Sequence, residues 1–90
     1  MATTIPNPNF PVVTEAIWSE ETPIEITTQI VLKIRELQSE GKTDGLFDIP
    51  DTQAPFHAYR NWVDTDAANA WVAWLQSIGG PTLASIQVLP

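Results

Sequence analysis

The sequence predicts an α+β protein of the ferredoxin-like order βαββαβ, in which two helices cover one face of an antiparallel sheet. Two observations support this class. First, segments with the apolar–polar alternation of strands are followed along the chain by segments with the apolar spacing of helices. Second, both expected helices have clear start and stop signals. With 90 residues a single domain is expected. We place it at residues 12–90, after a proline-rich arm at 1–11.

The arm contains three prolines, which restrict the preceding residues to extended backbone, so we expect an extended conformation at 1–11. Residues 12–19 are rich in β-branched side chains and form the first expected strand. Alternation places Val13, Glu15 and Ile17 on one face of this strand and Val12, Thr14, Ala16 and Trp18 on the other.

The first helix is expected to begin at Pro23, because Thr22 offers an N-cap hydroxyl and Glu25 stands three residues after it. Gly41 is the expected stop, since glycine readily adopts the left-handed conformation that ends helices. The apolar spacing puts Ile26, Ile30, Ile34 and Leu37 on an inward stripe, and Gln29, Lys33, Glu36 and Glu40 outward.

A hairpin is expected over residues 46–63. Its first part, 46–49, is a candidate short edge strand between turn signals, and its second part, 56–63, is a strand rich in aromatic side chains. In that second strand Ala58, Arg60 and Trp62 alternate with His57, Tyr59, Asn61 and Val63.

The second helix is expected to begin at residues 64–66, where Asp64 or Thr65 can cap it, and to end at residues 79–81 (Gly-Gly-Pro). A closing strand follows at residues 82–89. The helix is apolar around most of its circumference, which one small sheet cannot bury, so we expect self-association into a homodimer. The candidate interface residues are Trp71, Trp74, Val72 and Leu75.

Charge excludes several partners. Four basic residues against eleven acidic ones give a net charge of −7, which disfavours nucleic acid and anionic membranes as partners. The chain has no cysteine, no apolar run long enough for a signal peptide and no stretch that predicts a membrane span. We therefore expect a cytoplasmic protein.

The stretch YRNWVD at Tyr59–Asp64, followed by the helix AANAWVAWLQSI, resembles the second half of dimeric ferredoxin-like proteins of the antibiotic-biosynthesis-monooxygenase type. In that group a strand ending in an aromatic residue leads through a polar cap into an apolar helix with an inward Trp. The resemblance implies a homodimer whose sheets face each other. It carries over no mechanism, because haem-degrading members use an Asn, Trp and His set and no histidine follows Trp62 here.

The proline-rich start and the Arg-x-Trp strand also resemble small proteins of marine phages. That second resemblance implies no role; if the chain is a phage protein, its place would be intracellular or in the virion.

His57 is the one side chain with an ordinary pKa near neutrality, so it is a candidate general base or an ordinary strand residue. Arg60 is a candidate for binding an anion or for structural pairing. Asp44, Asp48 and Asp51 do not have calcium-loop spacing, so we expect turn carboxylates and no metal.

Two functional hypotheses follow. The first is a non-enzymatic interaction or assembly protein that acts as a homodimer, and the sequence favours it because no set of acid, base and nucleophile is present. The second is a cofactor-free small-molecule binder or monooxygenase-like enzyme, with a pocket between helices and sheet. Its walls would be Trp62, Tyr59, Trp71 and Phe47, and its polar contacts Arg60, His57 or Asn61. Neither hypothesis requires a cofactor.

Overall fold

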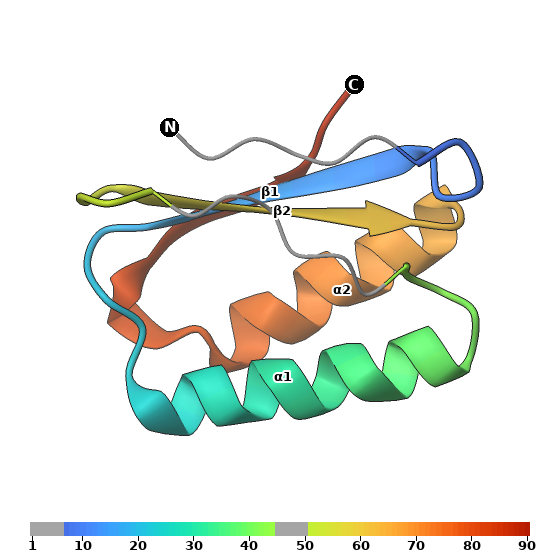
Figure 1. The fold of residues 1–90 in the computed structure, drawn as a ribbon. Helices are drawn as coiled ribbons and strands as arrows, with labels where there is room; N and C mark the ends of the chain where they lie inside the picture. The colour runs from blue at the N-terminus through green and yellow to red at the C-terminus, as the bar shows by residue number, and fades with distance from the viewer. Residues whose placement is uncertain (1–6, 45–50) are drawn as a thin grey trace.

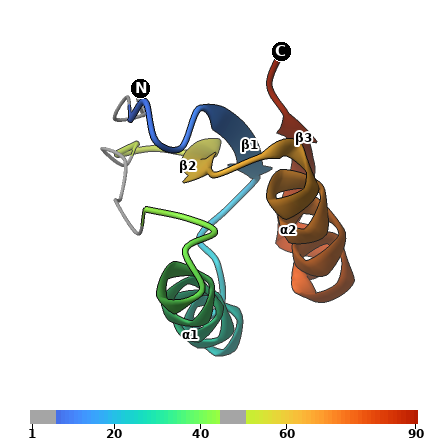
Figure 2. The same ribbon diagram turned by 90° about the vertical axis from the view of Figure 1, so that its right-hand side faces the viewer.

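The computed structural model describes residues 7–44 and 51–90. These residues form a small α+β fold with the element order β1, α1, β2, α2, β3. The three strands make an antiparallel sheet in the order β2-β1-β3, and both helices lie on one face of it (Figures 1 and 2). This agrees with the expected class of an antiparallel sheet with two helices on one face.

β1 (Val12–Trp18) is the central strand, one residue shorter than expected. It pairs with β2 (Phe56–Trp62) from Val12↔Trp62 to Trp18↔Phe56, and with β3 (Leu83–Val88) from Thr14↔Val88 to Trp18↔Leu83. Thr14, Ala16 and Trp18 are buried under the helices. The alternation that divides the faces of β1 is therefore confirmed.

α1 (Ile24–Ser39) begins one residue later than expected, with Pro23 as its N-cap and no side-chain cap. The expected cap by the Thr22 hydroxyl is wrong. Instead the Thr22 carbonyl accepts a bond from the Thr27 hydroxyl, and the Pro23 carbonyl accepts the first backbone bonds.

The C-terminal end of α1 follows the prediction. Gly41 adopts a φ of 75°, and its N–H donates to the Gln38 carbonyl while the N–H of Lys42 donates to Leu37. This is the Schellman arrangement, which satisfies the last carbonyls of a helix.

The inward stripe of α1 is also confirmed: Ile34 is buried, and Ile26, Ile30 and Leu37 pack against the core. Of the four residues expected to point outward, Gln29, Glu36 and Glu40 are exposed as predicted, and Lys33 is half-buried. Lys33, Glu36 and Glu40 line a groove facing α2, because α2 lies beside α1 on the same side of the sheet.

The connection after α1 reaches the outer edge of β2. Thr43 forms an isolated antiparallel bridge with Trp62, and the N–H of Val63 donates to the Lys42 carbonyl. Because the other edge of β2 is paired with β1, Thr43 extends the sheet outward. The candidate strand at 46–49 lies outside the described residues.

α2 (Thr65–Ile78) is capped by Asp64, whose carboxylate accepts a 2.8 Å bond from the N–H of Ala67. The helix ends at Gly79. Close packing favours glycine at this position, because a Cβ there would lie 2.5 Å from Leu83 Cδ2 and 2.9 Å from the Leu75 carbonyl oxygen. A 3-10 turn (Gly80–Thr82) then leads into β3.

The core lies between the sheet and the two helices, with most of its large side chains from the sheet and α2. Trp62, Leu75 and Thr14 have the largest fully buried side chains, and Trp71 is 3 % exposed. The ring centroids of Trp62 and Trp71 are 5.2 Å apart. Within the described part of the chain, no helix is both long and apolar enough to cross a membrane.

The described part of the N-terminal arm is a turn, not the extended segment expected for it. The N–H of Phe10 donates to the Asn7 carbonyl, and the N–H of Asn9 donates to the Asn7 side chain. This Asx-type bonding explains the difference, because an Asn side chain can fix a turn that proline alone would leave extended.

Candidate functional site

The face of the sheet opposite the helices carries a polar ladder across all three strands. Glu15 lies directly across from Tyr59 on β2 and from Gln87 on β3. Its two carboxylate oxygens accept bonds from the Tyr59 hydroxyl at 2.7 Å and from the Gln87 amide at 3.1 Å. The central acid of this open face is thus already hydrogen-bonded by two neutral donors.

A second acidic group is paired with the histidine of this face. Asp51 Oδ2 lies 2.7 Å from His57 Nδ1 and also accepts a 2.8 Å bond from the His57 backbone N–H. The two side chains are 20 % (His57) and 8 % (Asp51) exposed. The His57 ring stacks beside Tyr59 at 6.4 Å between centroids. The pair fixes the imidazole, which is the arrangement of an oriented base, yet no nucleophile lies against it among these contacts.

Asn61, also on this side of β2, holds the surrounding loops together. Its amide donates a 2.9 Å bond to Asp44, and the same carboxylate oxygen accepts from Asn7 at 3.2 Å. The Asn61 carbonyl accepts a 2.7 Å bond from the Thr43 hydroxyl. With 4 % of its surface exposed, Asn61 contributes to structure rather than offering a ligand contact.

Arg60 and Trp62 point to the helix side of β2. Trp62 is fully buried, and its indole N–H donates a 2.9 Å bond to the Thr14 hydroxyl. Arg60 stands across from Thr14 in the register, half-buried on the same face. Of the five candidate ligand contacts, the structure therefore brings His57, Tyr59 and Asn61 to one face and places Arg60 and Trp62 on the other.

This division contradicts the pocket expected between helices and sheet. Trp62 and Trp71 belong to the core and Tyr59 faces away from the helices, so these three cannot line one cavity. Phe47, the fourth expected wall, lies outside the described residues.

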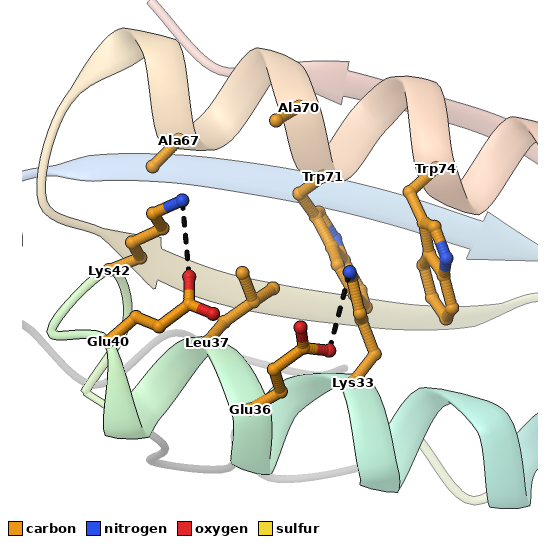
Figure 3. Close-up of a pocket in the computed structure, with 9 residues that line it drawn as sticks. All are labelled: Lys33, Glu36, Leu37, Glu40, Lys42, Ala67, Ala70, Trp71 and Trp74. Atoms are coloured by element: carbon orange, nitrogen blue, oxygen red, sulfur yellow. Dashed lines mark hydrogen bonds and ion pairs between the residues drawn. The ribbon is translucent and has the colours of Figure 1, made fainter.

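The structure instead forms a groove between the two helices, with a volume of about 400 Å³ (Figure 3). From α2 it is lined by Ala67, Ala70, Trp71 and Trp74, and from the α1 side by Leu37 and a charged rim. The indoles of Trp71 and Trp74 stack with centroids 5.3 Å apart. Neither His57 nor Arg60 lines this groove.

The rim of the groove consists of two ion pairs. Lys33 lies 3.5 Å from Glu36, and Lys42 lies 3.2 Å from Glu40. The Lys33 ammonium also lies 5.8 Å from the centre of the Trp74 ring. The groove is therefore apolar on the α2 side and charged on the α1 side.

The four candidate interface residues divide into two pairs. Trp71 and Leu75 are buried within the chain at 3 % and 1 % exposure, so they offer little surface to a partner. Trp74 and Val72 are half-buried and retain some accessible surface. α1 and the sheet together cover part of the apolar surface of α2. Less apolar surface is therefore left for a partner than the sequence indicated.

The aspartates considered for a calcium loop, as far as they are described, bond to other side chains. Asp44 bonds to Asn7 and Asn61, and Asp51 bonds to His57, while Asp48 lies outside those residues. Within 7–44 and 51–90, no group of three His, Cys, Asp or Glu side chains is placed to hold a metal ion.

Sequence reasoning missed the central position of Glu15 and the charged rim of the groove. The alternation of β1 predicts the face on which Glu15 lies, but the hydrogen-bond partners of Glu15 depend on the register between strands. The rim depends on the relative placement of two helices, for which the sequence carries no local signal.

Comparisons of the chain with protein-family models, with curated proteins and with solved structures find no significant match in any of the three. Function therefore has to be inferred from the geometry of the chain itself.

Proposed function

We propose that this chain is an interaction protein that forms a reversible homodimer through the open face of its sheet. The observation that carries the proposal is that both helices lie on one face, while the opposite face has its acids hydrogen-bonded within it (Figure 2). Within residues 7–44 and 51–90 no helix covers this face, although Asn7 and Asp44 bond over Asn61 at one part of it. A sheet face without a helical layer is one of the surfaces through which small α+β domains associate.

We also propose that the fold is ferredoxin-like, with a fourth strand beside β2. The Thr43–Trp62 bridge supports this, because it begins a pairing on the outer edge of β2, where that arrangement places the strand preceding β2. The observed order β2-β1-β3 is compatible with the remaining three strands.

Charge opposes the association of any two copies, because the chain has a net charge of −7. Three of the described acids lie at the open face, each with a bonded partner: Glu15 accepts from Tyr59 and Gln87, Asp51 faces His57, and Asp44 accepts from Asn61. The other seven described acids lie near helix ends or in turns: Glu20, Glu21, Glu25, Glu36, Glu40, Asp64 and Asp66.

The apolar part of the contact comes from the same alternation. Val13 and Ile17 flank Glu15 on β1 and share its face, with Tyr59 beside them on β2. Apolar side chains beside hydrogen-bonded polar groups occur in protein interfaces.

The area of the open face determines how strongly we expect two copies to associate. Three strands of six or seven residues cover roughly 300 Å², well below the roughly 800 Å² per partner of a standard stable interface. We therefore expect an association that depends on protein concentration and dissociates on dilution.

The test compares two substitutions by sedimentation velocity. Ile17→Lys places a charge on the open face, and Leu32→Lys places the same charge on the outer side of α1, where Leu32 is 59 % exposed. We expect Ile17→Lys to stay monomeric at concentrations where the wild type and Leu32→Lys form dimers. Thermal unfolding of each variant establishes that it is folded. Loss of dimers in Leu32→Lys alone would place the contact on the helical side and overturn the proposal.

A further inference from the structure

We propose that the groove between α1 and α2 binds a planar aromatic carboxylate. The groove has a volume of about 400 Å³, within the range of roughly 300–1,000 Å³ that is usual for small-molecule sites. It is separate from the open sheet face, because the helices that form it lie on the other side of the sheet. Binding of a small molecule in this groove would be a property in addition to the proposed self-association.

The space exists because α2 presents small residues beside large ones. Ala67 and Ala70 stand one turn before Trp71 and Trp74, so the indoles border a hollow that larger side chains at 67 and 70 would fill (Figure 3). Stacked aromatic rings offer an apolar wall suited to another flat ring. Trp74 is half-buried and keeps accessible surface for such a contact.

The charged side of the groove favours an anion. In Figure 3 the ammonium groups of Lys33 and Lys42 reach further toward α2 than the carboxylates of Glu36 and Glu40. The Lys33 ammonium already lies 5.8 Å from the Trp74 ring centre, so a ring on Trp74 brings its carboxylate within reach of Lys33. The ion pair that Lys33 makes with Glu36 is long, at 3.5 Å, and the Glu36 side chain is 56 % exposed, so the pair offers weak competition.

The net charge of −7 acts in the opposite direction, since it attracts cations over long distances. At physiological ionic strength charges are screened beyond about 8 Å. A carboxylate in contact with Lys33 is therefore governed by that ammonium, and the preference for an anion should hold in about 0.15 M salt.

The experiment uses three probes with one ring and different charges: naphthalene-2-carboxylate, naphthalene-2-methanol and naphthalen-2-ylmethylammonium. Binding is followed by the indole N–H signals of the four tryptophans in two-dimensional NMR. We expect the carboxylate to shift the Trp71 and Trp74 signals saturably, with a dissociation constant on the order of 1 mM or below. The carboxylate should bind roughly threefold or more tightly than the alcohol, and the ammonium most weakly.

Two matched pairs of variants complete the test. Ala70→Leu fills the groove, whereas Ala73→Leu makes the same change at an exposed position of α2 that does not line it. We expect binding to fall at least about tenfold in the first and to stay within about twofold in the second. Lys33→Met should remove the preference for the carboxylate over the alcohol, and Arg35→Met, on the exposed side of α1, should keep it.

Three results would overturn the proposal: no saturable shift of Trp71 and Trp74, equal effects of Ala70→Leu and Ala73→Leu, or a preference for the ammonium probe. None of these bears on the dimer, which is measured separately on the other face of the sheet. The two proposals can therefore fail independently.

Discussion

The hydroxyl of Tyr59 donates a 2.7 Å hydrogen bond to the carboxylate of Glu15, its direct partner across the β1–β2 pair. This bond fixes two side chains of different strands on the open face. With the bond from Gln87, it leaves both oxygens of the central acid of that face hydrogen-bonded within the chain.

Tyr59→Phe removes this donor and keeps the ring. A hydrogen bond to a charged acceptor is worth more than one between neutral groups, but the pair is half-exposed, so we expect a loss of about 1 kcal/mol in the free energy of unfolding. Urea unfolding measures it. In a Glu15→Gln background the same substitution should cost less, because the acceptor is neutral; an equal cost in both backgrounds would show that the negative charge of Glu15 does not strengthen the bond.

Thr14→Val tests the buried bond between Trp62 and Thr14. Valine keeps the shape of threonine but leaves the indole N–H of Trp62 without its acceptor in the core. We expect a loss of about 1–3 kcal/mol, a large share of the stability of a domain this small. Thr28→Val, at an exposed position of α1, is the control and should change the stability by less than about 1 kcal/mol.

Asp64→Ala removes the cap of α2. Its carboxylate accepts from the N–H of Ala67, so the substitution should lower the free energy of unfolding by about 1 kcal/mol. Asp66→Ala, two residues on, removes only a favourable charge in the first turn and should cost about 0.5 kcal/mol. Chemical denaturation of both variants separates capping from charge, and equal losses would mean that the cap bond is of no consequence.

Gly79→Ala tests the close approach that ends α2. The backbone there has a φ of −63°, which alanine adopts freely, so any cost comes from the contacts of the new Cβ with Leu83 and Leu75. We expect a loss of about 1–3 kcal/mol, as for overpacking of a core. Gly41→Ala meets no atom within 4 Å and should lose about 1–2 kcal/mol through its positive φ alone. Crystal structures of the two variants would show a shifted Leu83 in the first and none in the second.

Local signals in the sequence predicted much of the fold. The Asp64 cap, the stop at Gly41 and the apolar stripe of α1 are short-range patterns, and the structure has all three. Thr22 failed as a cap because Pro23 takes the N-cap position itself.

The candidate site was less predictable, because it depends on contacts between distant segments. His57 and Tyr59 were identified from residue type and alternation, but Asp51 and Glu15 joined them only through loop placement and strand register. The pattern of α2 alone predicts an interface role for Trp71 and Leu75, because it does not show that α1 and the sheet together bury them.

The proposed reversible self-association is tested most directly by the mass of the wild-type chain as a function of its concentration. Static light scattering from low to high micromolar concentrations should show a mass that rises from 9.9 kDa toward twice that value. A mass that stays at 9.9 kDa throughout, at physiological salt, would contradict self-association.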